Sequence, residues 1–383
     1  MPVRATKRGG DRTPLSGDFD VVICGASFAG LAVARELRAT DARVLVLDRY
    51  EIGERQTSAC AAPTTWLHNL GLEASILQTF DALVFHTPTI SARWPLPWTF
   101  STFDYRRLCA LLWDQRGPYT DFETAKVSGR TAEIIHTDRG DVAAPLIVDA
   151  LGWRRLLDPE RDVTPPEALM SRGLEVHPAG AGTDLEVWIH KGYIEAGYGW
   201  SFPAGDEVRV GLGSFEPRHH VKEPTVRLAA DLGLPPEGYQ GNWIPHAIRP
   251  AAADGVFFVG DSAGHCIPLT AEGIRTAFYF GIAAGRELRA VLEGDRSREQ
   301  ALVNYAHFSA ERAWKFAWMK RWQDTVWRLR PRARDALVRS MTHRRAAAWA
   351  FGHYWRIAPP EFALPAPAAA LPRPNAADEP IAA

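Results

Sequence analysis

Two loops far apart in the chain carry residues that could bind a large cofactor. The first follows an apolar run at 20–24 and extends from Gly25 to Gly30, where a helical pattern begins. Such a loop directs backbone N–H groups and the positive end of a helix dipole at one point, which suits a pyrophosphate. Asp48 ends the next apolar strand, 23 residues after Gly25, where a carboxylate can accept hydrogen bonds from a ribose diol. We predict a dinucleotide site, with FAD or NAD favoured over NADP.

One position departs from the usual glycine pattern of such loops. Ser27 replaces the middle glycine, so its Cβ narrows the approach of a phosphate, although its hydroxyl could donate a hydrogen bond. Taken alone, the loop could be only a tight strand-to-helix turn, and Asp48 and the second loop favour the nucleotide interpretation. The predicted cofactor residues of this unit are Gly25, Ser27, Phe28, Ala29, Gly30, Asp48 and Arg49.

The second loop begins 235 residues after the first. An apolar run at 256–259 ends at Gly260-Asp261, and the segment from Pro268 to Ile274 leads into a predicted helix over 272–293. A further apolar strand at 146–149 ends in Asp149 and is followed by Gly152. Loops of this type at both ends of the chain indicate one large cofactor.

The order of the predicted elements indicates an α/β fold with α+β elements. A β-α-β unit at the start and the strands at 146–149 and 256–259 predict a parallel sheet. The segment 165–248 alternates apolar and polar residues around the turn Pro203-Ala204-Gly205-Asp206, which is typical of antiparallel strands. Helices are predicted at about 66–77, at 104–115 and over 299–329.

These elements predict an interrupted cofactor domain. We assign residues 18–82, 104–160 and 249–297 to a discontinuous Rossmann-like domain, residues 83–103 and 161–248 to an antiparallel-sheet substrate domain, and residues 298–358 to closing helices. The composition of residues 1–17 and of the Pro/Ala-rich 359–383 is typical of disordered tails.

Composition excludes several classes of function. The 44 basic and 45 acidic residues of the 383-residue chain give a net charge of −1, so nucleic acid is not an expected partner. The four cysteines form no Cys-x-x-Cys pair, which argues against a zinc site or a disulfide framework. We predict a cytoplasmic protein, because the sequence shows neither a signal peptide nor the roughly 20-residue apolar stretch of a membrane span.

The motifs together resemble those of flavoproteins with the hydroxybenzoate-hydroxylase fold. In that fold, Gly260-Asp261 would match the motif whose aspartate binds the ribityl chain, and the segment from Asp149 to Gly152 a second nucleotide motif. The resemblance extends from about residue 18 to 292. Within the fold, Tyr198-Gly199-Trp200-Ser201-Phe202-Pro203 resembles the Tyr-x-Trp-x-Phe-Pro substrate motif of the geranylgeranyl reductase family.

The resemblance implies further site residues. The segment 268–274 resembles the flavin-proximal segment of that family, with Ala271 at a position where glycine is usual. A helix that begins near Thr270 would direct its dipole at the flavin ring, where negative charge accumulates on reduction. Cys60 is the candidate for a family cysteine, although alanines replace the neighbouring glycines. The implied cofactor residues are Asp149, Gly152, Gly260, Asp261, Pro268, Gly273, Ile274 and either Arg106 or Arg107.

The implied reaction is hydride transfer from reduced FAD to a carbon–carbon double bond of an isoprenoid or similarly apolar substrate. Tyr198, Trp200 and Phe202 are the predicted substrate-binding residues, and Cys60 and Tyr198 the candidate acids or cation stabilisers. Core packing is the alternative role for these aromatic residues. NADH, NADPH or a small redox protein would supply the electrons. The alternative reaction is that of an FAD-dependent monooxygenase or epoxidase acting on an apolar natural product, since the fold supports both.

A tryptophan stripe near the C-terminus allows two interpretations. Trp314, Trp318 and Trp322 lie four residues apart in a segment, 301–350, that holds 11 basic and 3 acidic residues, a net charge of 11 − 3 = +8. The stripe could pack against the cofactor domain, which is the favoured interpretation. It could instead rest on an anionic membrane surface, which predicts a protein peripheral at the membrane.

Overall fold

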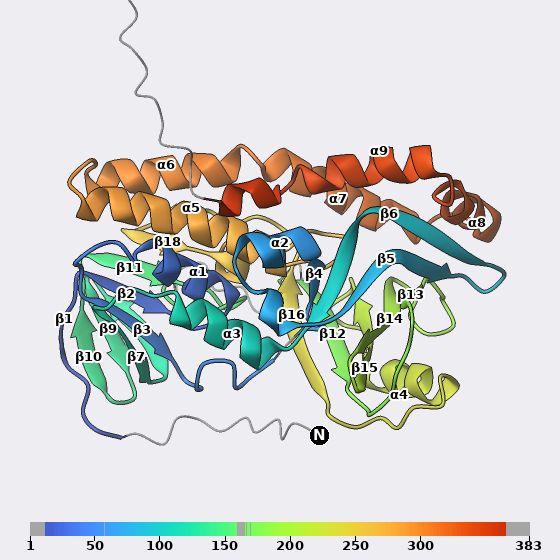
Figure 1. The fold of residues 1–383 in the computed structure, drawn as a ribbon, viewed down its shortest axis with the longest axis horizontal. Helices are drawn as coiled ribbons and strands as arrows, with labels where there is room; N and C mark the ends of the chain where they lie inside the picture. The colour runs from blue at the N-terminus through green and yellow to red at the C-terminus, as the bar shows by residue number, and fades with distance from the viewer. Residues whose placement is uncertain (1–11, 57, 159–164, 166, 169, 365–383) are drawn as a thin grey trace, which may run out of the picture.

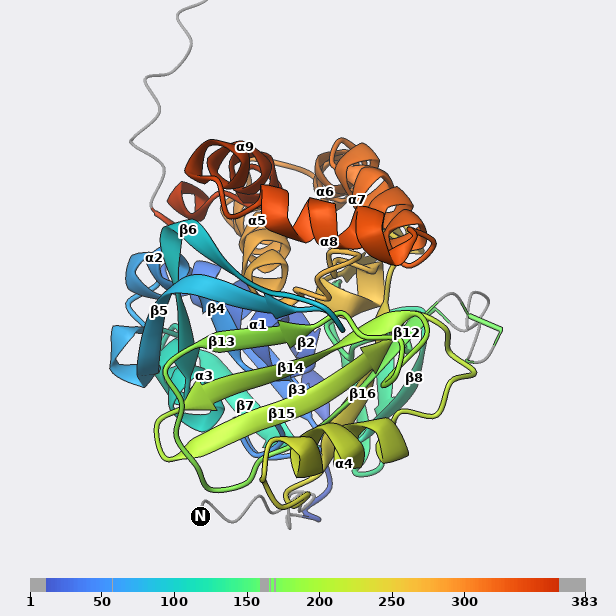
Figure 2. The ribbon, with the colours of Figure 1, turned by 90° about the vertical axis from the view of Figure 1, so that its right-hand side faces the viewer.

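Two large sheets lie under a layer of C-terminal helices. The structure is a computed structural model that describes residues 12–56, 58–158, 165, 167–168 and 170–364. One side of both sheets is covered by helices α5 (Ile274–Leu292), α6 (Arg298–Ala310), α7 (Ala313–Val326), α8 (Pro331–Ser340) and α9 (Arg344–Trp355) (Figures 1 and 2). This arrangement places the loops at the sheet ends, the antiparallel strands and the closing helices around one common space.

The first large sheet has six strands and is mainly parallel. Its order is β17 (Ala252–Ala253), β18 (Val256–Phe258), β11 (Leu146–Asp149), β2 (Val21–Cys24), β3 (Val44–Asp48) and β7 (Thr120–Thr124), and only β17 is antiparallel to its neighbour. Helices α1 (Phe28–Glu36), α3 (Tyr105–Asp114) and α5 (Ile274–Leu292) pack around it, with α1 directly against α5. The central strands are continuous apolar runs because both faces of the sheet are buried.

A small four-stranded sheet lies beside it. Its order is β1 (Gly17–Asp18), β10 (Gly140–Ala143), β9 (Ile134–Thr137) and β8 (Val127–Thr131). The predicted tail 1–17 is therefore wrong for its last residues: Leu15 is buried, its N–H donates to the Arg139 carbonyl at 2.8 Å, and Gly17 pairs with Val142. Residues 1–11 lie outside the described part of the chain.

The predicted C-terminal tail also begins too early. The short helix η4 (Pro360–Ala363) packs against α2 (Thr64–Asn69) and α5, and the Asn69 side chain donates to the Pro360 carbonyl at 2.9 Å. Arg286 donates to the carbonyls of Phe362 and Leu364. These contacts hold residues 359–364 on the domain surface, whereas residues 365–383 lie outside the described part.

The second large sheet has eight strands. Its order is β16 (Gln240–Pro245), β12 (Met170–Val176), β15 (Glu207–Ser214), β14 (Gly197–Ala204), β13 (Leu185–Trp188), β5 (Ile76–His86), β6 (Ser91–Phe103) and β4 (Ala61–Pro63). All neighbours are antiparallel except β13 and β5. Helix α4 (Lys222–Asp231) packs on one face, and residues of α7 and α8 pack on the other. The boundary that we predicted at residue 82 therefore falls inside β5.

Two predicted helices have different bounds in the structure. The helix predicted at 66–77 is only α2 (Thr64–Asn69), followed by the turn η1 (Glu73–Ser75). The helix predicted over 299–329 is two helices, α6 (Arg298–Ala310) and α7 (Ala313–Val326), and α8 (Pro331–Ser340) and α9 (Arg344–Trp355) follow. Within the described residues, no helix combines the length and apolar character needed to cross a membrane.

Candidate functional site

A cavity of about 1130 Å³ lies where the two large sheets meet the C-terminal helices. This volume exceeds the roughly 300–1,000 Å³ of a pocket for one drug-sized ligand. Its wall includes the loops after β2, β11 and β18, the inner face of the eight-stranded sheet, and residues of α5, α7, α8 and α9. The cavity can therefore hold a large cofactor beside an apolar ligand.

The first glycine loop has a backbone that other residues cannot adopt. Gly25 has φ +114°, and a Cβ built on it would lie 2.3 Å from the Ala150 carbonyl oxygen. A Cβ on Gly30 would lie 1.9 Å from the Gly25 carbonyl oxygen. Ser27 is the N-cap residue of α1 but makes no capping hydrogen bond with its side chain. Ser27, Phe28 and Ala29 line the cavity, so the start of α1 faces this space.

Five predicted cofactor residues in or near this loop lie away from the cavity wall: Gly25 and Gly30 of the loop itself, and Asp48, Arg49 and Arg106. The Asp48 carboxylate accepts hydrogen bonds from the Ala26 and Tyr50 N–H groups, at 2.9 and 3.1 Å, and its burial raises its pKa. Arg49 is exposed and stacks on Tyr50. Arg106, with a side chain 67% exposed, pairs with Glu54. In this arrangement Asp48 holds the loop in place.

The loop after β11 has a buried aspartate at its base. Asp149 is fully buried, and its carboxylate accepts hydrogen bonds from the Ser262 hydroxyl at 2.7 Å and from the N–H groups of Leu151 and Leu157. Asp149 therefore shapes the loop, because all of these donors belong to the chain. Gly152 lies on the cavity wall with φ +86° and open space where a Cβ would be.

The loop after β18 presents a carboxylate to the cavity. Gly260 has φ +59° and, with Asp261, lines the wall. Burial raises the pKa of Asp261 to about 6, although the nearby Arg249 lowers it. None of the described residues donates a hydrogen bond to the Asp261 carboxylate. This carboxylate is consequently available to accept hydrogen bonds from a ligand.

The segment before α5 is tightly turned. Leu269 and Ala271 have φ values of 71° and 51°, and Ile267 pairs with Glu272 in an isolated bridge. Because of these turns, α5 begins at Ile274, with Gly273 as N-cap, and not near Thr270 as we predicted. Gly273 and Ile274 line the cavity, and Pro268 lies outside its wall. A left-handed residue at 271 explains why glycine suits that position.

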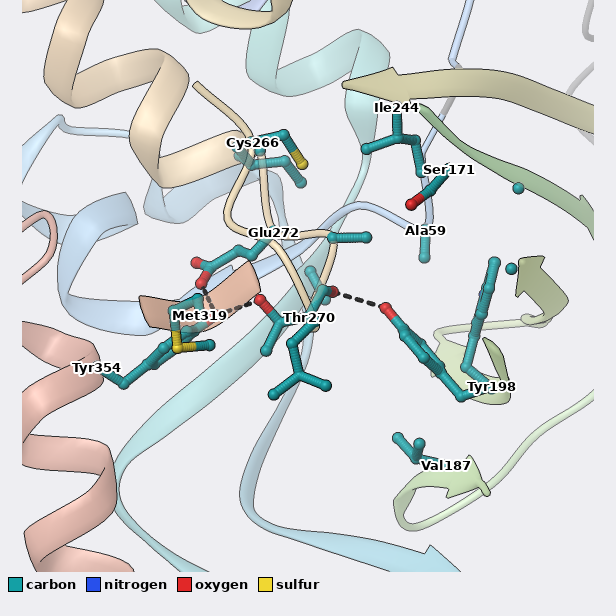
Figure 3. Close-up of a pocket in the computed structure, with 18 of the residues that line it drawn as sticks. Ala59, Ser171, Val187, Tyr198, Ile244, Cys266, Thr270, Glu272, Met319 and Tyr354 are labelled. Carbon is teal, nitrogen blue, oxygen red and sulfur yellow. Dashed lines mark hydrogen bonds between the residues drawn. The ribbon is translucent and has the colours of Figure 1, made fainter. Parts of the chain in front are cut away.

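The aromatic residues of β14 share one face. Tyr198, Trp200 and Phe202 alternate along the strand and all line the cavity. The Tyr198 hydroxyl donates to the Thr270 carbonyl at 2.6 Å (Figure 3), and burial raises the pKa of this tyrosine. The Trp200 indole N–H donates to Glu175 at 3.2 Å. The structure thus brings the predicted substrate residues to the turned segment before α5.

Cys60 lies on the same wall. It is fully buried and has φ 53°, a left-handed conformation that favours glycine. Its carbonyl accepts hydrogen bonds from the Phe103 N–H and from Arg209.

A polar cluster that the sequence analysis missed lies beside the turned segment. The Tyr354 hydroxyl, from α9, donates to Glu272 and lies 3.1 Å from the Thr270 hydroxyl (Figure 3). Arg275 is fully buried and donates to Glu272 at 2.8 Å. Thr270 and Glu272 belong to the segment 268–274 that the sequence analysis identified, whereas Tyr354 lies 82 residues beyond Glu272.

Sequence comparisons identify reductases among the relatives. No protein-family model matches the chain. Digeranylgeranylglycerophospholipid reductase 3 of Methanosphaera stadtmanae is 24% identical over 333 residues, which cover 76% of this chain and 82% of that protein. Digeranylgeranylglycerophospholipid reductase of Methanococcus vannielii is 31% identical over 129 residues, 31% of this chain. The match to the M. vannielii protein spans 33% of that protein's length.

Structure comparisons confirm the predicted fold class. A geranylgeranyl bacteriochlorophyll reductase-like protein from Thermoplasma acidophilum superimposes with a TM-score of 0.75 at 18% identity, covering 91% of this chain and 98% of that one. PqsL from Pseudomonas aeruginosa, described as a probable FAD-dependent monooxygenase, gives a TM-score of 0.62 at 17% identity, covering 88% and 100%. The chain has the mixed α/β fold that these two proteins share.

Proposed function

We propose that this chain, an oxidoreductase related to the geranylgeranyl reductases, binds FAD and reduces carbon–carbon double bonds of an isoprenoid or similarly apolar substrate. One observation carries the proposal: the glycine loops and the aromatic face of β14 line the same cavity. A cofactor held by the loops would therefore lie next to an apolar ligand held by Tyr198, Trp200 and Phe202.

The residues present fit FAD. The uncapped start of α1 suits a pyrophosphate, because its first N–H groups and its dipole are directed at the cavity. Asp261 offers a carboxylate with no donor among the described residues, and Gly152 leaves the backbone open to close approach, because a Cβ there would meet open space. When bound, FAD would supply the hydride.

The chain's own residues would exclude water and supply or hold a proton. An unactivated alkene needs a dry pocket and a placed acid, because water would intercept a carbocation-like transition state. Phe202 and the neighbouring aromatic residues provide the apolar wall. Tyr198 remains a neutral hydroxyl because burial raises its pKa, and it holds its proton against the Thr270 carbonyl. Cys60 is the other candidate, at the same wall.

The chemical nature of the product distinguishes the proposed reductase reaction from the monooxygenase reaction. The enzyme is reduced without oxygen, incubated with polyprenyl substrates, and the products are analysed by mass. A gain of hydrogen supports the reductase. An oxygenated product after admission of oxygen, together with a hydroperoxyflavin absorbance, would support the alternative, a monooxygenase or epoxidase on the fold that PqsL shares. Trials with NADH, NADPH and a reduced ferredoxin identify the electron donor.

If Cys60 assists the reaction, Cys60→Ala should keep its FAD but lower turnover at least about 100-fold, the range for loss of a general acid. Turnover is measured per bound FAD. Cys109→Ala is the matched control, because Cys109 is equally buried and does not line the cavity. Full turnover in Cys60→Ala would remove this cysteine from the mechanism.

We further propose that the mouth of the cavity rests on an anionic membrane. Trp314, Trp318 and Trp322 of α7 and Trp349 of α9 line the cavity and are 66%, 42%, 37% and 65% exposed. This exposure supports the membrane interpretation of the stripe over packing on the cofactor domain. Exposed Arg321 follows Trp318 by three residues and exposed Arg345 precedes Trp349 by four, so basic groups flank the indoles. This arrangement suits a peripheral protein that takes a substrate from lipid.

Trp314→Ala/Trp349→Ala should reduce flotation with anionic vesicles at least about fivefold, since these two exposed indoles would supply much of the apolar contact with the membrane. Flotation at low salt with and without phosphatidylserine is the measurement. Tyr119→Ala is the control, because Tyr119 is exposed away from the cavity. Wild-type protein that stays unbound to anionic vesicles would contradict the membrane proposal.

A further inference from the structure

A buried arginine in α8 lacks a partner and lines the cavity. Arg334 is only 3% exposed, and its Nε and Nη1 groups have no hydrogen-bond acceptor among the described residues. Other buried arginines have one: Arg209 pairs with Glu207 at 2.8 Å and Arg275 with Glu272 at 2.8 Å. A buried guanidinium without hydrogen-bond acceptors is costly, so Arg334 would be stabilised by an acceptor that the described residues do not supply.

The carboxylate next to Arg334 in sequence is engaged elsewhere. Asp335 accepts hydrogen bonds from the hydroxyls of Thr87, at 2.7 Å, and Thr89, at 2.5 Å. These bonds fix its side chain at the β5–β6 turn. Arg334 and Asp335 therefore do not neutralise each other through a hydrogen bond.

A second buried donor on the same wall is also unpaired. The Trp327 indole N–H has no acceptor among the described residues, and its ring lines the cavity. Around it lie apolar residues of the cluster that joins α7 and α8 to the eight-stranded sheet, including Val326 and Val338. The wall thus offers a cation and a neutral donor within apolar surroundings.

We propose that Arg334, with the Trp327 indole N–H, forms a subsite for the oxyanion head group, a phosphate or carboxylate, of an amphiphilic ligand whose apolar chain fills the cavity. A guanidinium matches the planar, bidentate geometry of such groups, and an indole N–H can only donate. This inference rests on the proposed function for the apolar chain and adds the charge at its end. It assigns recognition of that charge to Arg334 of α8 and to Trp327 at the end of α7.

The test compares the affinities of farnesyl monophosphate and farnesol for the oxidised, FAD-loaded enzyme. Binding is monitored by the change in tryptophan fluorescence. Farnesyl monophosphate should bind at least about 10-fold more tightly than farnesol, as expected for hydrogen bonds to a charged group. Arg334→Met should abolish that preference and leave the farnesol affinity within about threefold. Arg339→Met, at an exposed position in the same helix, should behave as wild type.

Competition with inorganic phosphate tests whether the subsite recognises an amphiphile or a free anion. At the concentration of the probe, inorganic phosphate should not displace farnesyl monophosphate, because it lacks the apolar chain. Displacement at equal concentration would assign the subsite to a free anion and overturn the amphiphile. Equal affinities of farnesol and its phosphate for wild type would overturn the subsite itself.

The thermal unfolding temperature of Arg334→Met distinguishes a binding role of Arg334 from a structural one. Without an anionic ligand, Arg334→Met should unfold at a higher temperature than wild type, because methionine removes an unpaired buried charge at similar volume. Unfolding at a lower temperature would show that the arginine serves packing and would overturn the proposal. None of these measurements requires turnover, so failure of the reductase assignment would leave their outcome intact.

Discussion

Asp261→Ala should lose most of its FAD. The Asp261 carboxylate faces the cavity without a donor from the described residues, so it is free to accept hydrogen bonds from a cofactor. Loss of bonds to a charged acceptor costs about 1.5–3 kcal/mol, or about 10- to 150-fold in affinity. The measurement is flavin absorbance per protein after dialysis, with Asp295→Ala, at an exposed position, as control. Unchanged flavin content would exclude Asp261 from the cofactor site.

The Asp261 carboxylate should also affect how the stability of the cofactor-free protein depends on pH. Burial raises the pKa of Asp261 from 3.8 to about 6, so the folded state binds the proton more tightly than the unfolded state. Its contribution to stability is full below pH 3.8 and is lost as the pH rises through about 6. The difference is at most about 3 kcal/mol, since one pKa unit is about 1.4 kcal/mol. Urea unfolding at pH 5 and pH 8 should therefore differ less in Asp261→Asn than in wild type.

The parts of the fold that could be predicted are those with local signals. The strand, loop and helix from Val21 to Glu36 combine a buried apolar run with glycines that the backbone requires. The helix predicted at 66–77 was wrong for a reason visible in the sequence. Gly71 adopts φ +68° and ends that segment's helical stretch, as glycine commonly does after a helix.

Other features depend on contacts that sequence cannot show. The break between α6 and α7 contains neither glycine nor proline. There, Arg312 donates to the Phe308 carbonyl at 2.7 Å and lies over the Tyr279 ring, so packing against α5 accompanies the end of α6. Tyr354 and Arg334 escaped prediction for the same reason: only the folding of α8 and α9 over the sheets brings them to the cavity.

Arg275→Met should produce the largest loss of stability. Arg275 is fully buried at the start of α5, where it donates to Glu272 and to the carbonyls of Tyr354, Trp355 and Ala358 at the end of α9. Its removal leaves the Glu272 carboxylate buried beside Tyr354 without its cation. Breaking a buried ion pair in this way costs about 3–5 kcal/mol. Urea unfolding measures it, and Arg339→Met, at an exposed position, should stay within about 0.5 kcal/mol.

A double variant separates the ion pair from the helix contacts. If the main cost is the uncompensated carboxylate, Glu272→Gln/Arg275→Met should recover part of the stability lost in Arg275→Met, because the remaining amide carries no charge. Strictly additive losses would instead show that the bonds from Arg275 to α9 dominate. In either case the connection matters for the site, because it ties α9, which supplies Trp349 and Tyr354 to the cavity wall, to the turned segment that holds Thr270. We therefore expect Arg275→Met to be cleaved faster than wild type by protease within 340–360, below its unfolding temperature.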